Sequence, residues 1–351
     1  MSISPKKLGL YGFLLLLSLV IPYLLPALQV QLAYLWLMVI FAMTWDIVGG
    51  QMGYNSFGNI FYFGVGMYIT AVVQRDLYYD VDEYAEIAGT IDMLNNEQYL
   101  TGLFLGLGVS GIVAVLLAIV LGSAIMGLRG HYFAICTLGL GIAAGEIAGG
   151  IDYVGAGSGL VTPVFPSGLG EKGIFFYYLY FVLAVVTFLV LRKIYSGRFG
   201  LAINAIRDDE DKAEAMGLHT VRYKTTAWSV AAFFVAIAGG ITGNFIGFID
   251  PIDTAFAGST FGVWMVLMAI LGGKGTLWGP VVGAVMFHIA KELLWTYLFG
   301  LQWVALGALI VIIVVFFPQG MMGYIRARRP EWLGHKVDKN MTIDANEESA
   351  K

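Results

Sequence analysis

Residues 100–126 read LTGLFLGLGVSGIVAVLLAIVLGSAIM and contain no charged side chain. Crossing about 30 Å of hydrocarbon takes about 20 consecutive apolar residues, so this run is long enough to span a membrane as a helix. Nine further apolar segments flank it, at 8–28, 30–49, 57–73, 131–149, 174–192, 225–249, 260–273, 280–298 and 301–318. The sequence therefore predicts an all-α fold, a polytopic transmembrane helical bundle with about ten membrane segments. The segments at 57–73, 131–149 and 260–273 are short or Gly-rich, which favours broken or re-entrant helices there.

The composition excludes a soluble enzyme, a nucleic-acid binder and a disordered chain. Of 351 residues, 58% are hydrophobic and 13% are charged, against roughly 45–50% and about 25% in ordinary soluble domains. The 46 glycines are typical of membrane helices, which pack closely through them. The net charge of −4 gives no nucleic-acid footprint, and the single cysteine, Cys136, excludes a disulfide framework. The histidines are scattered without ligand spacing, so we expect neither a metal site nor a catalytic centre.

The distribution of charge between the segments predicts the orientation. Loop 74–99 holds seven acidic side chains and one basic one, whereas 192–224 holds seven basic ones. Short loops rich in Lys and Arg stay in the cytoplasm. We therefore expect 192–224 and both termini inside, 74–99 and 150–173 outside, and an uncleaved first helix. Residues 1–325 then form one transmembrane domain, and 326–351 form a polar cytoplasmic tail.

The chain carries no motif for hydrolysing a nucleotide. In the stretch GGKGT, which ends at Thr276, Met268 replaces the first glycine of a phosphate-binding loop, and Gly275 follows the lysine instead of Ser or Thr. We interpret this stretch as a tight cytoplasmic turn. An ion-coupled transporter needs ionisable groups at membrane depth, and the candidates are few: Asp46, Glu146, His288, Lys291 and Glu292. His288 and Glu292 share a helix face and are expected to be an internal pair or lip residues. The chain is interpreted as a passage without its own energy source.

A short helix is predicted within 192–224. Residues 208–211 supply acidic side chains to its first turn, where they complement the positive end of the helix dipole. Gly217 is typical of a helix end, and Ala213 and Met216 are available to a neighbour. Two interpretations stay open: a solvated loop helix, or a peg that enters the groove of a partner protein.

The same stretch resembles the coupling loop of ABC importer permeases, in the form found in branched-chain amino acid permeases of the LivM type. The matching residues are Ser196-Gly197-Arg198-Phe199-Gly200, Ala205-Ile206-Arg207, Glu210, Ala213 and Gly217. Further blocks resemble the family in unbroken order between about residues 35 and 325: 128–134 with Thr137, Leu138 and Glu146, then 157–160, 251–256 and 272–280. Two features depart from the pattern. Loop 74–99 is long, and Lys212 stands where many relatives have a small or aliphatic residue.

The resemblance implies the membrane-spanning subunit of an importer, which is not itself an enzyme and binds no cofactor. Such a permease pairs with a second, related permease in the cytoplasmic (inner) membrane of a prokaryote. Two cytoplasmic ATPases, which bind ATP and Mg, dock on the coupling loop, here 194–223. A periplasmic or extracellular binding protein delivers the substrate. The resemblance assigns the coupling role to Arg207, Asp208, Glu210, Asp211, Ala213 and Gly217.

Branched-chain or other hydrophobic amino acids are the substrates that the resemblance implies. Urea, short amides or aromatic acids are the alternative within the same importer class. A stand-alone secondary transporter is a second class of function.

Polar residues beside the apolar segments are candidates for the translocation pathway. Asn55, Ser56 and Asn59 lie around the start of one segment, and Thr137 and Glu146 lie in another. Polar, non-helical backbone near a membrane is tolerated where it lines a cavity or is buried in protein. A pathway and a hydrogen-bonded turn are therefore both open for 53–59.

Small residues spaced four apart predict close helix packing, at Gly141, Gly145 and Gly149 and at Gly239, Gly243 and Gly247. Ser56-Phe57-Gly58 and Thr260-Phe261-Gly262 echo each other at the start of segments of opposite direction. This pattern is compatible with an inverted repeat.

Overall fold

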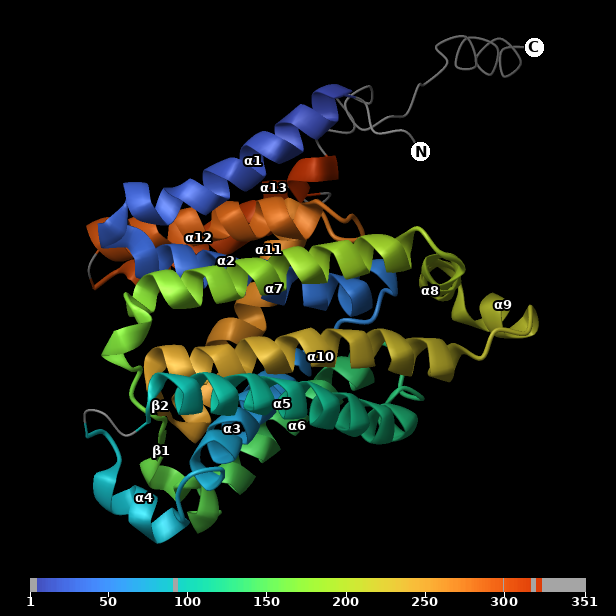
Figure 1. Cartoon of the computed structure of the whole chain (residues 1–351). Coiled ribbons are helices and arrows are strands. Elements are labelled where there is room, and N and C mark those ends of the chain that lie inside the picture. Colours follow the sequence, from blue (N-terminus) through green and yellow to red (C-terminus); the bar gives the residue numbers. More distant parts are fainter. Residues whose placement is uncertain (1–4, 91–93, 299, 317–319, 324–351) are drawn as a thin grey trace, which may run out of the picture.

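The computed structural model describes residues 5–90, 94–298, 300–316 and 320–323. Long helices lie side by side, with α8 and α9 at one end of the bundle and α4 and the two strands at the other (Figure 1). The predicted tail, 326–351, lies outside the described residues. The elements are α1 (Pro5–Leu24), α2 (Gln29–Asp46), α3 (Asn59–Asp76), α4 (Val81–Ile87), α5 (Asn96–Ile125), α6 (His131–Gly149), β1 (Leu160–Val161), α7 (Lys172–Tyr195), α8 (Arg198–Asp208), α9 (Glu210–Ala215), α10 (Thr220–Ile246), β2 (Phe248–Ile249), α11 (Val263–Gly272), α12 (Gly279–Tyr297) and α13 (Gln302–Phe316).

The predicted helical membrane bundle is confirmed, and each of the ten predicted segments contains a helix. Among the described residues, six helical stretches are long and apolar enough to cross a membrane: Pro26–Gln51, Asn96–Ile125, His131–Gly149, Lys172–Tyr195, Thr220–Ile246 and Pro251–Gly272. Leu14–Leu24 is a shorter apolar helix. The helices α3, α12 and α13 coincide with predicted segments but are not among the six, so the structure supports fewer full spans than the prediction of ten segments.

Of the three segments predicted to be broken or re-entrant, two are continuous helices. Both α3 and α6 run without a break. The irregular backbone instead precedes α3, as a π-helical turn at Ile47–Gln51 and a non-helical linker at 52–58. The third expectation is confirmed, because two π-helical turns at Pro251–Ala255 and Gly258–Gly262 interrupt the chain before α11. Each echoed triad therefore lies at the start of a helix, and the inverted repeat stays a prediction.

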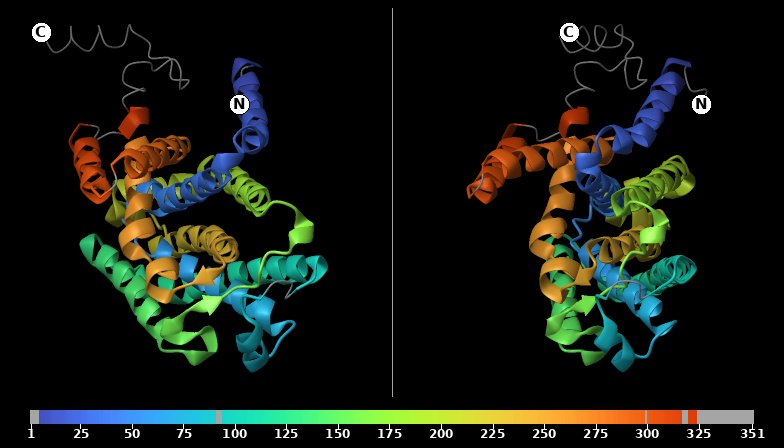
Figure 2. Two further views of the ribbon diagram at one scale, coloured as in Figure 1. Left: turned by 90° about the vertical axis from the view of Figure 1, so that its left-hand side faces the viewer. Right: turned by 60° about the vertical axis from the view of Figure 1, so that its left-hand side comes forward.

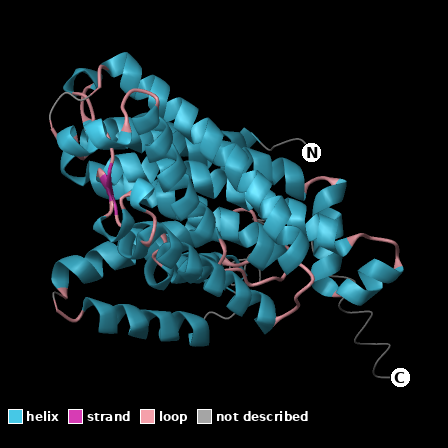
Figure 3. Cartoon of the chain, turned by 90° about the horizontal axis from the view of Figure 1, so that it is seen from below, coloured by secondary structure: helices cyan, strands magenta, loops and turns pink. Residues whose placement is uncertain are grey.

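Helices α3, α5 and α10 pack against one another most extensively in the bundle. Figure 3 shows from below that the chain is almost entirely helical. A Cβ at Gly239 of α10 would overlap the carbonyl oxygen of Phe63, and one at Gly66 of α3 would overlap that of Ala236. The backbones therefore touch directly, as small residues permit in membranes. This confirms the packing predicted for the α10 glycines at Gly239. Gly247 differs, because it ends α10 with φ +93° and has no atom within 4 Å of an added Cβ.

The end of the bundle that is predicted to face outward contains two strands and a short helix that the sequence did not predict. Strands β1 and β2 pair antiparallel and join the connection after α6 to the turn after α10. Helix α4 lies within the acidic loop, and its Tyr84 hydroxyl donates to the carbonyl oxygen of Val161 at 2.7 Å. The loops at 74–99 and 150–173 are therefore tied together through β1.

Candidate functional site

Two short helices, α8 and α9, occupy the connection between α7 and α10. Helix α8 is amphipathic and buries Gly200, Ala202, Ile203 and Ile206 on one face. Asp209 then adopts an extended conformation (φ −166°, ψ 105°), and its side chain accepts the backbone N–H of Lys212 at 3.0 Å. This cap ends one helix and begins the next. The predicted single helix starting at Asp208 is therefore wrong: Asp208 ends α8, and Glu210 and Asp211 open α9.

The side chains of α9 divide between an exposed and a buried face. Met216 is 85% exposed, and the side chain of Asp211 is 79% exposed. Ala213 is buried within the chain, so the prediction that it is available to a neighbour is wrong. Gly217 has φ +89°, a left-handed conformation that glycine adopts without strain. The helix end predicted at Gly217 is confirmed.

Glu210 lies on the buried face and binds Lys224 and Tyr54. Its carboxylate is 2.6 Å from the Nζ of Lys224, which lies in the first turns of α10. The Tyr54 hydroxyl, in the linker 52–58, donates to the other carboxylate oxygen of Glu210. Lys224 also donates to the Tyr54 hydroxyl at 3.2 Å, and its Nζ lies 4.6 Å from the centre of the Tyr54 ring. We call these three residues the ionic joint.

The ionic joint is shielded from water. The side chain of Lys224 is 1% exposed and that of Glu210 is 11% exposed. Burial by itself would raise the pKa of Glu210, but the hydrogen bonds from Lys224 and Tyr54 outweigh it and leave that pKa below its ordinary value. Burial and the bond to Glu210 together raise the pKa of the Tyr54 hydroxyl. Glu210 is therefore ionised and Tyr54 neutral at physiological pH.

Arg129, in the connection between α5 and α6, forms the outer side of the same cluster. Its guanidinium is 2.7 Å from Asp211, 3.6 Å from Glu210 and 3.7 Å from Glu214. Half of the Arg129 side chain is exposed, so these contacts are solvent-accessible and individually weak. Sequence reasoning missed Arg129, Tyr54 and Lys224. Arg129 and Tyr54 are distant in the chain from α9, and although Lys224 is only 14 positions from Glu210, no local pattern pairs the two.

Arg207, at the end of α8, lies against two glycines of the bundle. A Cβ at Gly53 would lie 2.9 Å from the Cγ of Arg207, and one at Gly275 would lie 3.6 Å from its Nη1. The backbone N–H of Gly275 donates to Asp46 at 2.7 Å, so the turn at 272–276 is bound to the end of α2. Arg207 also pairs with the neighbouring Asp208 at 2.9 Å.

The pathway candidates separate into buried and exposed groups. Ser56, Asn59 and Thr137 are buried and are brought together at the linker 52–58. The Thr137 hydroxyl accepts the N–H of Phe57 at 3.1 Å, and Asn59 donates to the Thr44 hydroxyl at 3.3 Å. The carbonyl of Ser56 accepts the indole N–H of Trp45 at 2.8 Å. These three residues thus hold a hydrogen-bonded turn, the second of the two interpretations left open for 53–59.

Asn55 and Glu146 are exposed. Glu146 lies on the outward face of α6, the least buried of the six spans with 22% of its residues buried. Helix α6 runs along the edge of the bundle (green in Figure 2). The same face carries the exposed apolar side chains Tyr132, Ile135, Ile142 and Ile147.

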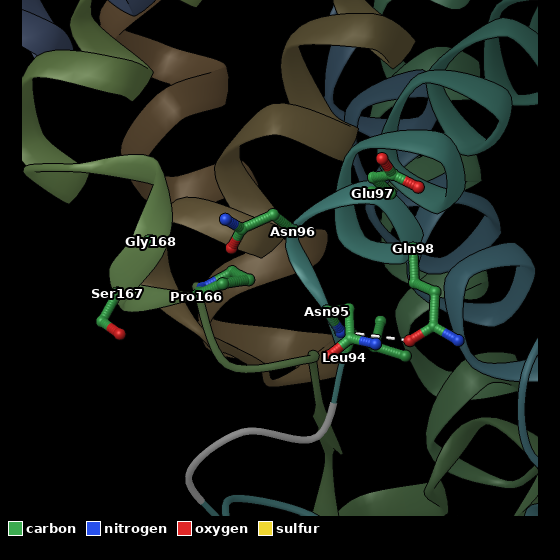
Figure 4. Close-up of a pocket in the computed structure, with 8 residues that line it drawn as sticks. All are labelled: Leu94, Asn95, Asn96, Glu97, Gln98, Pro166, Ser167 and Gly168. Atoms are coloured by element: carbon green, nitrogen blue, oxygen red, sulfur yellow. Dashed lines mark hydrogen bonds between the residues drawn. The ribbon is translucent and has the colours of Figure 1, made fainter.

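A hollow of about 620 Å³ opens at the end of the bundle opposite α9, between the start of α5 and the stretch 166–168 (Figure 4). Two of its five polar lining side chains, Asn95 and Gln98, form a reciprocal capping box for α5. A second hollow of about 490 Å³ lies beside α9 and is lined by Glu214, Gly217, Leu218, His219, Thr220, Val221 and Arg222.

Of the two expectations for His288 and Glu292, an internal pair or lip residues, the internal pair is wrong. Glu292 pairs with its neighbour Lys291 at 2.8 Å, and the Nδ1 of His288 has no hydrogen-bond partner. The Nζ of Lys291 also lies 5.4 Å from the centre of the Trp264 ring. In the part of the chain that the structure describes, no group of three or more His, Cys, Asp or Glu side chains is placed to hold a metal ion.

Similarity to known proteins identifies the family of this chain. A family model described as branched-chain amino acid transport system / permease component matches residues 28–317. The chain is 24% identical to the high-affinity branched-chain amino acid transport system permease protein LivM of Salmonella typhimurium over 338 residues, covering 87% of this chain and 79% of that protein.

Two Escherichia coli proteins of the same transport system are also similar, each matched over less than two thirds of its length. Its permease protein LivM is 27% identical over 69% of this chain and 62% of the relative. Its permease protein LivH is 31% identical over 43% of this chain and 47% of the relative. No solved structure matches the chain. Because the family model spans most of its length, this protein belongs to the family of branched-chain amino acid transport permeases.

Proposed function

We propose that this chain forms the translocation pathway of an ABC importer for branched-chain or other hydrophobic amino acids, with ATP hydrolysed by separate subunits that dock on α8 and α9. One observation carries the docking proposal. The helix pair lies beyond one end of the bundle, is held from behind by the ionic joint, and presents Asp208, Asp211 and Met216 outward. A buried anchor with an exposed apolar and charged face suits a protein partner.

The partners follow from the family. LivM and LivH relatives are permeases of one transport system, which supports a second, related permease beside this chain. The second permease is expected to pack against the edge helix α6, because Glu146 and the apolar side chains around Glu146 are exposed there. We place Asn55 and Glu146 on the pathway, with Ser56, Asn59 and Thr137 supporting the linker behind them.

The orientation completes the proposal. The end with α8, α9 and the basic side chains faces the cytoplasm of a prokaryotic cell, together with both termini. The end with α4 faces outward, towards a periplasmic or extracellular binding protein. ATP and Mg bind to the ATPases, and this chain holds no cofactor.

The test is affinity purification of the chain from its native membrane, with the co-purifying proteins identified by mass. We expect an ATPase and a second permease with the wild-type chain. Met216→Arg is expected to reduce recovery of the ATPase at least tenfold while leaving the chain folded, because Met216 packs against little of its own protein. A chain recovered alone would contradict the proposal.

Gly217 provides a matched pair of variants. Gly217→Arg should also lose the ATPase, because an arginine in a left-handed conformation strains the end of α9 and adds a bulky charge there. Gly217→Asn tolerates that conformation and should keep the ATPase. Equal recovery with both variants would mean that the end of α9 is not in the interface.

The substrate class is tested on the binding protein that co-purifies. Calorimetric titration with leucine, isoleucine and valine should give tight binding, and urea, acetamide and benzoate should not bind. The reverse pattern would assign the chain to the alternative substrates. Uptake driven by an ion gradient in liposomes with this chain alone, abolished by Glu292→Gln, would instead support a secondary transporter.

A further inference from the structure

We propose that the ionic joint, Glu210 with Lys224 and Tyr54, transmits movement of α9 to α10 and to the linker 52–58, and that Glu210 does not contact the ATPase. The inference rests on the proposed function, since it needs an ATPase that moves α9. It makes Glu210 and Lys224 positioning residues for transport, and it separates them from the docking face.

Burial is the first argument. Glu210 points into the protein, with an 11% exposed side chain, whereas Asp211 beside it is 79% exposed. Both oxygens of the Glu210 carboxylate are engaged, one by Lys224 and the other by Tyr54. A partner that bound Glu210 would have to displace these contacts. Asp208 and Asp211 also form ion pairs, with Arg207 and Arg129, but both carboxylates are exposed, so a partner could meet them at little cost.

The chain segments that meet here are the second argument. Glu210 is in the first turn of α9, Lys224 in the first turns of α10, and Tyr54 in the non-helical linker between α2 and α3. One carboxylate therefore joins the cytoplasmic helix pair to the long central helix and to an irregular segment. Tyr54 is held on its own side as well, because its N–H donates to the carbonyl of Val48 at 2.9 Å.

The strength of the contacts is the third argument. Separating a buried ion pair leaves an uncompensated charge in a medium of low polarity, so such a pair resists opening far more than an exposed one. The exposed pairs that tie α9 to the rest of the chain, Arg129–Asp211 and Arg129–Glu214, can exchange with water at little cost. A displacement of α9 is thus expected to break or rearrange those pairs and to carry Lys224 and Tyr54 along.

The linker passes the displacement further. Phe57 is bonded to Thr137 of α6, and Ser56 to Trp45 of α2. Arg207 lies against Gly53 on the same linker. The linker therefore connects the cytoplasmic helix pair with α6, the edge helix that exposes Glu146. This is a continuous route of packed and hydrogen-bonded groups from the docking face to the proposed pathway.

The experiment uses the complete importer, both permeases with the ATPases and the binding protein, reconstituted in liposomes. Three quantities are measured for each variant: ATPase recovered with the permease, ATP hydrolysed, and amino acid transported. Glu210→Gln and Lys224→Met should keep the ATPase at the wild-type level and lower the amount transported per ATP at least tenfold. The control is Glu292→Gln, which removes one partner of an ion pair remote from α9 and should transport within twofold of wild type.

Two further variants guard against a folding defect. Tyr54→Phe keeps the ring over Lys224 and removes the hydroxyl only, so it should fold and lose part of the transport per ATP. The exchange Glu210→Lys with Lys224→Glu restores opposite charges and should recover transport relative to either single change. Elution of each variant in gel filtration reports whether it is folded.

Several results would overturn the inference. Loss of the ATPase with Glu210→Gln, as with Met216→Arg, would make Glu210 a docking contact. Normal transport per ATP with Glu210→Gln, or with Tyr54→Phe if the Glu210 and Lys224 variants do not fold, would show that the joint transmits nothing. A wild-type chain that never retains an ATPase would instead refute the proposed function.

Discussion

Replacing Gly239 with alanine tests the contact between α3 and α10 that organises the bundle. The added methyl group would meet the backbone carbonyl of Phe63 well inside 3.0 Å, where ordinary contacts begin at about 3.4 Å. A backbone atom cannot rotate away, so one helix has to shift. Overpacking of this kind costs about 1–3 kcal/mol, occasionally more. Because the atom that is met belongs to a rigid backbone, we expect a cost at the upper end of this range, about 3 kcal/mol. This lowers the ratio of folded to unfolded protein by about two orders of magnitude.

Two other glycines of the same helix serve as controls. A Cβ at Gly243 would lie 3.1 Å from the Cδ1 of Ile249, the mobile end of a side chain, so Gly243→Ala should cost less than about 1 kcal/mol. Gly247→Ala meets no neighbour but puts alanine in a left-handed conformation, at about 1–2 kcal/mol. The assay is unfolding of the purified chain in mixed detergent micelles, followed by far-ultraviolet circular dichroism. Equal stabilities of Gly239→Ala and Gly243→Ala would refute the direct backbone contact.

Three further outcomes are expected. Thr137→Val leaves the N–H of Phe57 without its acceptor and should cost about 1–3 kcal/mol in the same unfolding assay, whereas Thr137→Ser should not. Asp46→Ala removes the acceptor for the N–H of Gly275 and should lower the unfolding midpoint more than Asp46→Asn, which keeps an oxygen there. Because the pKa of Glu210 is lowered in the folded protein, its contribution to stability is complete above its unfolded value of about 4.3 and is lost as the pH falls through the lower folded value. The stability difference between wild type and Glu210→Gln should thus be constant from about pH 5.5 to 8 and shrink below about pH 4; a change near neutrality would contradict it.

The positions of the helices follow from the sequence because apolar runs and charged loops are local signals. The ten predicted segments all hold helices, and the left-handed end at Gly217 is where a glycine after a polar helix indicates it. The sequence also contains a signal for α8, because Ala202, Ile203 and Ile206 are spaced to lie on one helix face. The predicted helix instead starts at Asp208, because acidic residues favour the first turn of a helix.

The rest depends on contacts between distant residues. Tyr54 and Glu210 are 156 positions apart, and nothing near either one indicates the other. The pairing of Leu160 with Ile249 is likewise set by where the helices end in space. Two-residue strands of this kind have no periodic pattern of their own. The coupling and pathway roles assigned to individual residues stay predictions.

The contact between α3 and α10 also bears on how the protein is made. Helix α3 ends at Asp76 and α10 at Ile246, so about 170 residues are synthesised between them. At roughly 5–20 residues per second, this takes on the order of ten to thirty seconds. During that interval the face of α3 that carries Gly66 has no α10 to pack against. Helix α5, which also packs against α3 and is synthesised soon after it, is therefore expected to hold α3 in place until α10 is made.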